Sequence, residues 1–85
     1  MSREVRWAKR ALKAVSRLDR PTRDRITGAI KLLAGSNQGD VRRLQGAPAD
    51  TYRLRVGTWR VLFAYLHDAA LLILDVGARG DVYKK

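Results

Sequence analysis

The sequence predicts an α+β fold in which an N-terminal strand and a two-helix hairpin pack on one face of a mainly antiparallel β-sheet, in the order β-α-α-β-β-β. Three observations predict it. The first half of the chain carries apolar residues at helical spacing, the second half alternates between polar and apolar residues, and a Gly-Thr pair separates two of the alternating runs. Its 85 residues suffice for one domain, which we expect to span residues 1–85.

The first half of the chain is expected to form a short strand and two helices. Residues 4–7 alternate and predict an edge strand, whereas the apolar residues that follow recur at spacings of three and four. The stripe of the first helix consists of Ala8, Ala11, Leu12, Val15 and Leu18. A second helix is expected to begin at Pro21 and to end at Gly35, and the short link between the helices favours an antiparallel hairpin. Its stripe consists of Ile26, Ala29, Ile30 and Leu33.

The second half is expected to form the sheet. Residues 36–50 are rich in loop-forming side chains and predict a loop. Three strands are predicted after it, over residues 51–56, 59–66 and 69–76. Gly57-Thr58 suits a two-residue type II′ turn between the first two, and His67-Asp68 is expected to form a second short turn.

Charge and cysteine content restrict the possible functions. Eighteen Lys and Arg residues against eight Asp and Glu give a net charge of +10, which implies a polyanionic or acidic partner. The chain has no cysteine and a single histidine, His67, so we expect no disulfide, no metal centre and no cofactor. The longest apolar runs have six residues, so we expect no membrane span and a cytoplasmic protein.

Three arginines are predicted to share one face of the sheet. With a two-residue turn at 57–58, Arg55 lies opposite Arg60, and Arg53 points to the same side. Charges that alternate along a strand often form only a solvated face. The use of arginine at all three positions instead favours an anion site, because the guanidinium fork binds phosphate in a bidentate way.

A carboxylate is expected to hold one of these arginines. If His67-Asp68 is a two-residue turn, then Arg60 lies opposite Asp75 in the next strand. The sequence therefore predicts a contact between Arg60 and Asp75.

Other candidate side chains favour structural roles. The basic residues of the helices, from Lys9 to Arg25, are expected to be solvated and to attract a polyanion without specific contacts. The second helix offers a poor set of side chains for reading DNA bases, so a helix-turn-helix is not expected. Four aromatic residues at strand positions are expected in the core: Trp7, Tyr52, Trp59 and Tyr65.

Two segments of the sequence resemble the RelE/ParE toxins of bacterial and archaeal toxin–antitoxin pairs. One is the run Tyr-Arg-Leu-Arg-Val-Gly-Thr-Trp-Arg-Val-Leu-Phe at 52–63, and the other is Val-Gly-Ala-Arg-Gly-Asp-Val-Tyr at 76–83. The Arg-Ala-Leu-Lys of residues 10–13 and the Leu-Gln-Gly near residue 45 also fit, so the resemblance covers nearly the whole chain. It implies a RelE/ParE-like fold that agrees with the predicted order of elements.

The RelE branch of this family implies a ribosome-dependent endoribonuclease, an mRNA interferase in which the 2′-OH attacks the adjacent phosphate. The resemblance places Arg53 and Arg55 at two basic positions of the site and Arg60 at the phosphate-binding arginine. It also implies that Arg79 donates a proton or stabilises the leaving group, and that Tyr83 stacks on a base or orients the nucleophile. The implied partners are the ribosome with its mRNA, and an antitoxin whose acidic or amphipathic segment wraps the toxin in a hetero-oligomer.

Two other functions stay open at this point. The ParE branch implies a DNA gyrase inhibitor that acts by protein–protein contact, although its members generally lack the combination of basic residues and tyrosine. A non-catalytic RNA-binding or ribosome-binding module is the second alternative. Relatives often have lysine or glutamate at the positions of Arg53 and Arg55, and many have histidine at Ala78. Because a guanidinium keeps its proton, the sequence identifies no general base.

Overall fold

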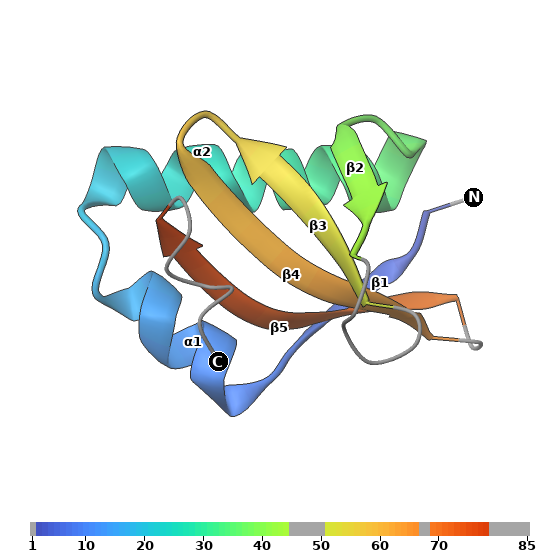
Figure 1. Cartoon of the computed structure of the whole chain (residues 1–85), viewed down its shortest axis with the longest axis horizontal. Coiled ribbons are helices and arrows are strands. Elements are labelled where there is room, and N and C mark those ends of the chain that lie inside the picture. Colours follow the sequence, from blue (N-terminus) through green and yellow to red (C-terminus); the bar gives the residue numbers. More distant parts are fainter. Residues whose placement is uncertain (1, 45–50, 67–68, 79–85) are drawn as a thin grey trace.

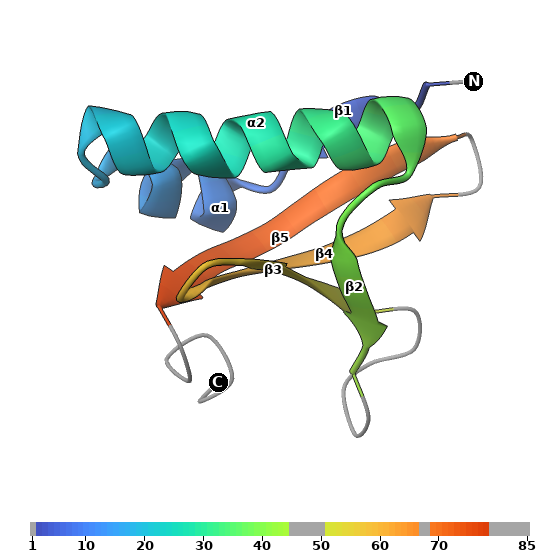
Figure 2. The ribbon, with the colours of Figure 1, turned by 90° about the horizontal axis from the view of Figure 1, so that it is seen from above.

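Two helices lie on one side of a five-stranded sheet in the computed structural model, which describes residues 2–44, 51–66 and 69–78 (Figures 1 and 2). The elements, in chain order, are β1 (Glu4–Trp7), α1 (Lys9–Ser16), α2 (Arg20–Ser36), β2 (Asp40–Arg43), β3 (Thr51–Val56), β4 (Trp59–Leu66) and β5 (Ala70–Ala78). The strand order across the sheet is β1-β5-β4-β3-β2. The predicted α+β class is confirmed, as is the placement of both helices on one face.

The sheet is mixed, because β1 runs parallel to β5 while the other neighbours are antiparallel. The β3–β4 hairpin has the predicted register, with Val56 opposite Trp59 and Arg55 opposite Arg60. Gly57 has a φ of 61°, which the first central position of a type II′ turn requires and which glycine adopts without strain. This turn therefore fixes which side chains of β3 and β4 share a face.

The edge strand β2 lies inside the segment that the sequence predicts to be a loop, so that prediction is wrong over Asp40–Arg43. These residues pair antiparallel with β3, with Asp40 opposite Arg55 and Arg42 opposite Arg53. The strand carries three charged residues and only one apolar residue, as edge strands often do. Its position is set by backbone pairing with β3 and not by an apolar stripe of its own.

The two helices are anchored to different strands. α1 contacts β5, whereas α2 lies against β1 and β3. Pro21 stands in the first turn of α2, as predicted. The helix ends at Ser36, one residue after Gly35. Asn37 adopts the left-handed conformation there, with a φ of 62°, and its N–H donates to the carbonyl of Leu33 at 2.9 Å.

The core lies between the helices and the sheet. Its largest fully buried side chains are Phe63, Ile26, Ile30, Leu33, Leu54, Leu71, Ile73 and Val61. Trp7, Tyr52, Trp59 and Tyr65 pack against this cluster, which agrees with the expected structural role of the aromatic residues. Leu12 is 51% exposed, so its assignment to the buried stripe is wrong. The buried residues of the short helix α1 are Ala11 and Val15, one turn apart.

No helix in the described ranges is both long and apolar enough to cross a lipid bilayer.

Candidate functional site

Four arginines lie on the face of the sheet that points away from the helices. Arg53 and Arg55 alternate along β3 with Leu54, which is buried in the core, and Arg60 precedes the buried Val61 on β4. The pairing of β2 with β3 adds a fourth arginine that the sequence did not single out. We call this set the arginine face: Arg42, Arg53, Arg55 and Arg60.

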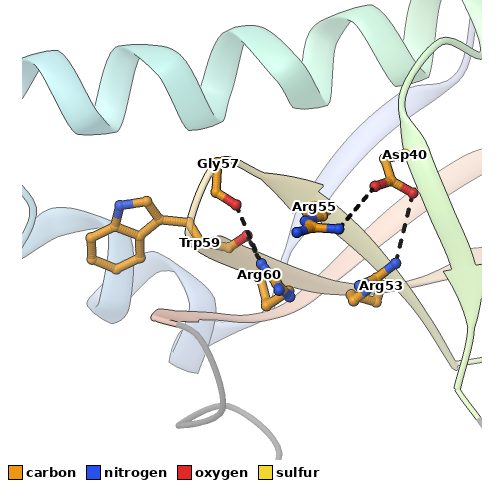
Figure 3. Close-up of polar contacts among 6 residues, drawn as sticks. All are labelled: Asp40, Arg53, Arg55, Gly57, Trp59 and Arg60. Atoms are coloured by element: carbon orange, nitrogen blue, oxygen red, sulfur yellow. Dashed lines mark hydrogen bonds and ion pairs between the residues drawn. The ribbon is translucent and has the colours of Figure 1, made fainter.

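Asp40 places a carboxylate among these arginines. Its Oδ1 lies 3.7 Å from Nη2 of Arg53, and its Oδ2 lies 3.9 Å from Nη1 of Arg55 (Figure 3). Asp40 occupies the first position of β2, directly opposite Arg55. Sequence reasoning missed this residue, because residues 36–50 were expected to form a loop. Both contacts exceed hydrogen-bond length, so they are ion pairs that leave lone pairs of the carboxylate available.

The Arg53 side chain combines deep burial with incomplete hydrogen bonding. Only 13% of its side chain is exposed, yet its buried Nε has no hydrogen-bond partner in the described part of the chain. Buried polar groups in native proteins are nearly always paired, and an orphan N–H is costly. The Arg53 guanidinium is therefore largely desolvated and is not fully paired within the described part of the chain.

Arg60 has local partners on its own hairpin. It is 9% exposed, and its Nη1 lies 3.2 Å from the carbonyl oxygen of Trp59 and 3.4 Å from that of Gly57, to both of which it donates (Figure 3). The indole ring of Trp59 points away from the arginines in the same view. These bonds fix the Arg60 guanidinium beside the turn, in the same row of the sheet as Arg55 and Asp40.

The predicted contact between Arg60 and Asp75 is wrong. Leu66 pairs with Ala70, which leaves residues 67–69 between β4 and β5, and the register shifts again between Leu62 and Phe63. As a result Asp75 lies opposite Leu62. Its carboxylate instead pairs with Arg10 of α1, whose Nε lies 3.1 Å from Oδ2. Arg10 is therefore not the purely solvated helix charge that the sequence predicts.

The other two predicted site residues, Arg79 and Tyr83, lie outside the described residues, as does the His67-Asp68 turn. The structure thus brings together Arg53, Arg55 and Arg60 of the predicted set and adds Asp40 and Arg42. Across the described residues, no group of three His, Cys, Asp or Glu side chains could hold a metal ion.

A hollow of about 360 Å³ lies on the other side of the sheet, between β1 and α2. It is lined by Val5, Trp7, Thr27, Ile30 and Lys31, and it contains none of the predicted site residues.

Comparison with protein families gives one match. A family model for the ParE toxin of the type II toxin–antitoxin system parDE matches residues 5–83. A search of curated proteins found no match.

Solved structures with the same fold include several toxin–antitoxin complexes. A chain of the archaeal RelE–RelB complex from Pyrococcus horikoshii is 28% identical, with a TM-score of 0.77, over 95% of this chain and 99% of that chain. A chain of the RelBE2 complex from Mycobacterium tuberculosis is 25% identical, with a TM-score of 0.62, and the match covers 93% of this chain and 100% of that chain. A chain of the Escherichia coli DinJ–YafQ complex is 15% identical, with a TM-score of 0.76, and the match covers 98% of this chain and 99% of that chain. At this identity the two chains share only their fold.

Proposed function

The chain belongs to the RelE/ParE family of toxins from type II toxin–antitoxin systems, and from this premise we propose that it is a ribosome-dependent mRNA endoribonuclease. In the proposed reaction the 2′-OH of a nucleotide attacks the adjacent phosphate and the bond to the 5′ oxygen breaks. The products are a 2′,3′-cyclic phosphate, or the 3′-phosphate that forms from it, and a 5′-OH end.

The observation that carries this proposal is the arginine face itself, on which four guanidinium groups gather and two of them, those of Arg53 and Arg60, are mostly buried. Negative charge builds up on the phosphate oxygens in the transition state, and fixed guanidinium groups in a partly desolvated site stabilise it strongly. We expect Arg53 and Arg55 to bind the RNA phosphate, and Arg60, which lies opposite Arg55, extends the row of positive charge across the sheet. Arg79 is proposed to stabilise the leaving group and Tyr83 to stack on a base or orient the nucleophile, as their positions in the RelE-like ending imply.

A cognate antitoxin is the second proposed partner. The structural relatives from Pyrococcus and Mycobacterium were solved as complexes with their antitoxins. The net charge of +10 favours an acidic or amphipathic segment that folds on the toxin and covers the arginine face in a hetero-oligomer.

One observation favours a different target. The family model that matches the chain is that of ParE toxins, and the resemblance to the ParE branch implies inhibition of DNA gyrase by protein–protein contact. In that case the arginine face would be a docking surface for an acidic protein region and not a catalytic site.

The proposal is tested by giving the purified protein three targets in parallel. These are ribosomes programmed with mRNA, the same mRNA without ribosomes, and gyrase with supercoiled plasmid. Primer extension maps new 5′ ends on the message, and gel electrophoresis detects linear plasmid trapped on gyrase. We expect cuts on ribosome-bound mRNA only. Trapped plasmid without mRNA cuts would assign the chain to the ParE activity, and ribosome binding without cuts would make it a non-catalytic module.

A further inference from the structure

The proposed cleavage needs a group that accepts the proton of the 2′-OH, and the arginine residues of the predicted site cannot supply it. A guanidinium keeps its proton at any physiological pH, so Arg53, Arg55 and Arg60 can bind phosphate but cannot act as bases. Among the described residues, the proton acceptor is therefore sought among the carboxylates of the sheet.

Asp40 lies among the arginines of this face, whereas Asp75 of β5 pairs with Arg10 of α1, and the two carboxylates differ in their surroundings. Both oxygens of Asp75 are engaged, because Oδ2 lies 3.1 Å from Arg10 and Oδ1 accepts a hydrogen bond from the N–H of Val76 at 2.9 Å. Asp75 is also only 14% exposed. Asp40 is 50% exposed, and its ion pairs of 3.7 and 3.9 Å are too long for hydrogen bonds. Asp40 is therefore the better proton acceptor of the two.

The position of Asp40 follows from the residue before it. Gly39 has a φ of 149°, and a Cβ atom at this position would lie 2.7 Å from Cδ1 of Leu54. Glycine avoids both the clash with the Leu54 side chain and the strain of the positive φ, and the next residue, Asp40, lies opposite Arg55 across the strand pair. The first residue of β2, Asp40, thus places its carboxylate beside Arg53 and Arg55 at the edge of the arginine face (Figure 3).

We propose that Asp40 is the general base of the cleavage reaction, an inference that rests on the proposed function. Arg53 and Arg55 bind the phosphate, and Asp40 beside them takes the proton of the 2′-OH as the O2′–P bond forms. The P–O5′ bond breaks, and the departing 5′ oxygen takes a proton from water. Asp40 then passes its own proton to solvent, so the protein ends the cycle unchanged. A carboxylate held next to two phosphate-binding arginines lies within reach of the 2′-OH of the same nucleotide.

The test compares three variants with the wild-type protein on programmed ribosomes. Asp40→Asn keeps the shape of the side chain and removes the base, and Asp40→Glu restores a carboxylate on a longer stem. Asp24→Asn is the matched control, because this exposed carboxylate lies on α2, where it pairs with Arg20. Single-turnover cleavage and ribosome binding are measured separately, and thermal melts establish that each variant is folded. A message with a 2′-deoxy nucleotide at the cut position checks that the 2′-OH is the nucleophile.

We expect Asp40→Asn to cleave about 10²–10⁴-fold more slowly than the wild type while it binds ribosomes at least as tightly. Asp40→Glu should recover part of the rate, and Asp24→Asn should cleave as the wild type does. Wild-type rates for folded Asp40→Asn would overturn the assignment. An equal loss of ribosome binding and of the cleavage rate would also overturn the assignment of Asp40 as the general base, because Asp40 would then only hold the arginine side chains in position. If the wild type itself fails to cut, the proposed function is wrong and the role of Asp40 is wrong with it.

Discussion

Nε of Arg10 lies 3.1 Å from Oδ2 of Asp75, and this ion pair joins α1 to β5 just beyond the register shift in that strand. β1 pairs with β5 only as far as Ile73. Asp75 therefore lies beyond the end of this pairing, in the part of β5 that α1 flanks. The burial of Ala11 and Val15 and the ion pair between Arg10 and Asp75 thus hold the short helix α1 against the sheet.

Arg10→Ala is expected to lower the free energy of unfolding by about 1 kcal/mol, because it leaves a mostly buried carboxylate with one partner fewer. Urea denaturation measures the change. Arg20→Ala is the control, since Arg20 and Asp24 form an exposed pair at 3.9 Å whose loss should cost less than about 0.5 kcal/mol. Equal losses in the two variants would show that the Arg10–Asp75 pair contributes no more than an ordinary surface pair.

Two adjacent leucines of α2 test where the core lies. Leu33 is 1% exposed and Leu32 is 54% exposed. Leu33→Ala should lower the free energy of unfolding by about 2–5 kcal/mol, because it leaves a cavity between the helix and the sheet. Leu32→Ala should change it by less than about 0.5 kcal/mol. Both are measured by urea denaturation, and similar losses in the two variants would mean that the helix buries a different face.

Two glycines are expected to respond to alanine in opposite directions. At Gly39 the methyl group would clash with Leu54 and the positive φ would be strained, so Gly39→Ala should cost about 1–3 kcal/mol. Gly28 lies in α2 with nothing within 4 Å of the added Cβ, so Gly28→Ala should stabilise the protein by about 0.5–1 kcal/mol. Thermal melts give the sign of each change. A neutral Gly39→Ala would indicate that the Leu54 side chain moves to make room and that the backbone at residue 39 relaxes from its positive φ.

The β3–β4 hairpin could be predicted residue by residue because its turn is local. Gly57-Thr58 selects a two-residue turn, and a known turn length fixes the register and hence the shared face of Arg53, Arg55 and Arg60. The stripe of α2 could be predicted for a similar reason, since seventeen residues establish a helical period.

The register of β4 and β5 could not be predicted, because it depends on a longer connection and on an irregularity at Leu62 and Phe63 that no residue pattern marks. Asp40 was missed for a different physical reason. Its strand has a single half-buried apolar residue, Val41, and is defined by its pairing with β3. The Asn-Gln-Gly-Asp sequence before it is typical of a loop. Only the Gly-Asp pair at 39–40 hints at the close approach.

RNA cleavage by the arginine face is tested most directly by the single-turnover rate of Arg53→Ala on ribosome-bound mRNA. We expect a loss of about 10²–10³-fold in this rate, because Arg53 donates to the phosphate from a desolvated position. Arg20→Ala, which removes the same charge from an exposed site on α2, should cleave at the wild-type rate. Wild-type cleavage by folded Arg53→Ala, or an equal loss in Arg20→Ala, would contradict the claim.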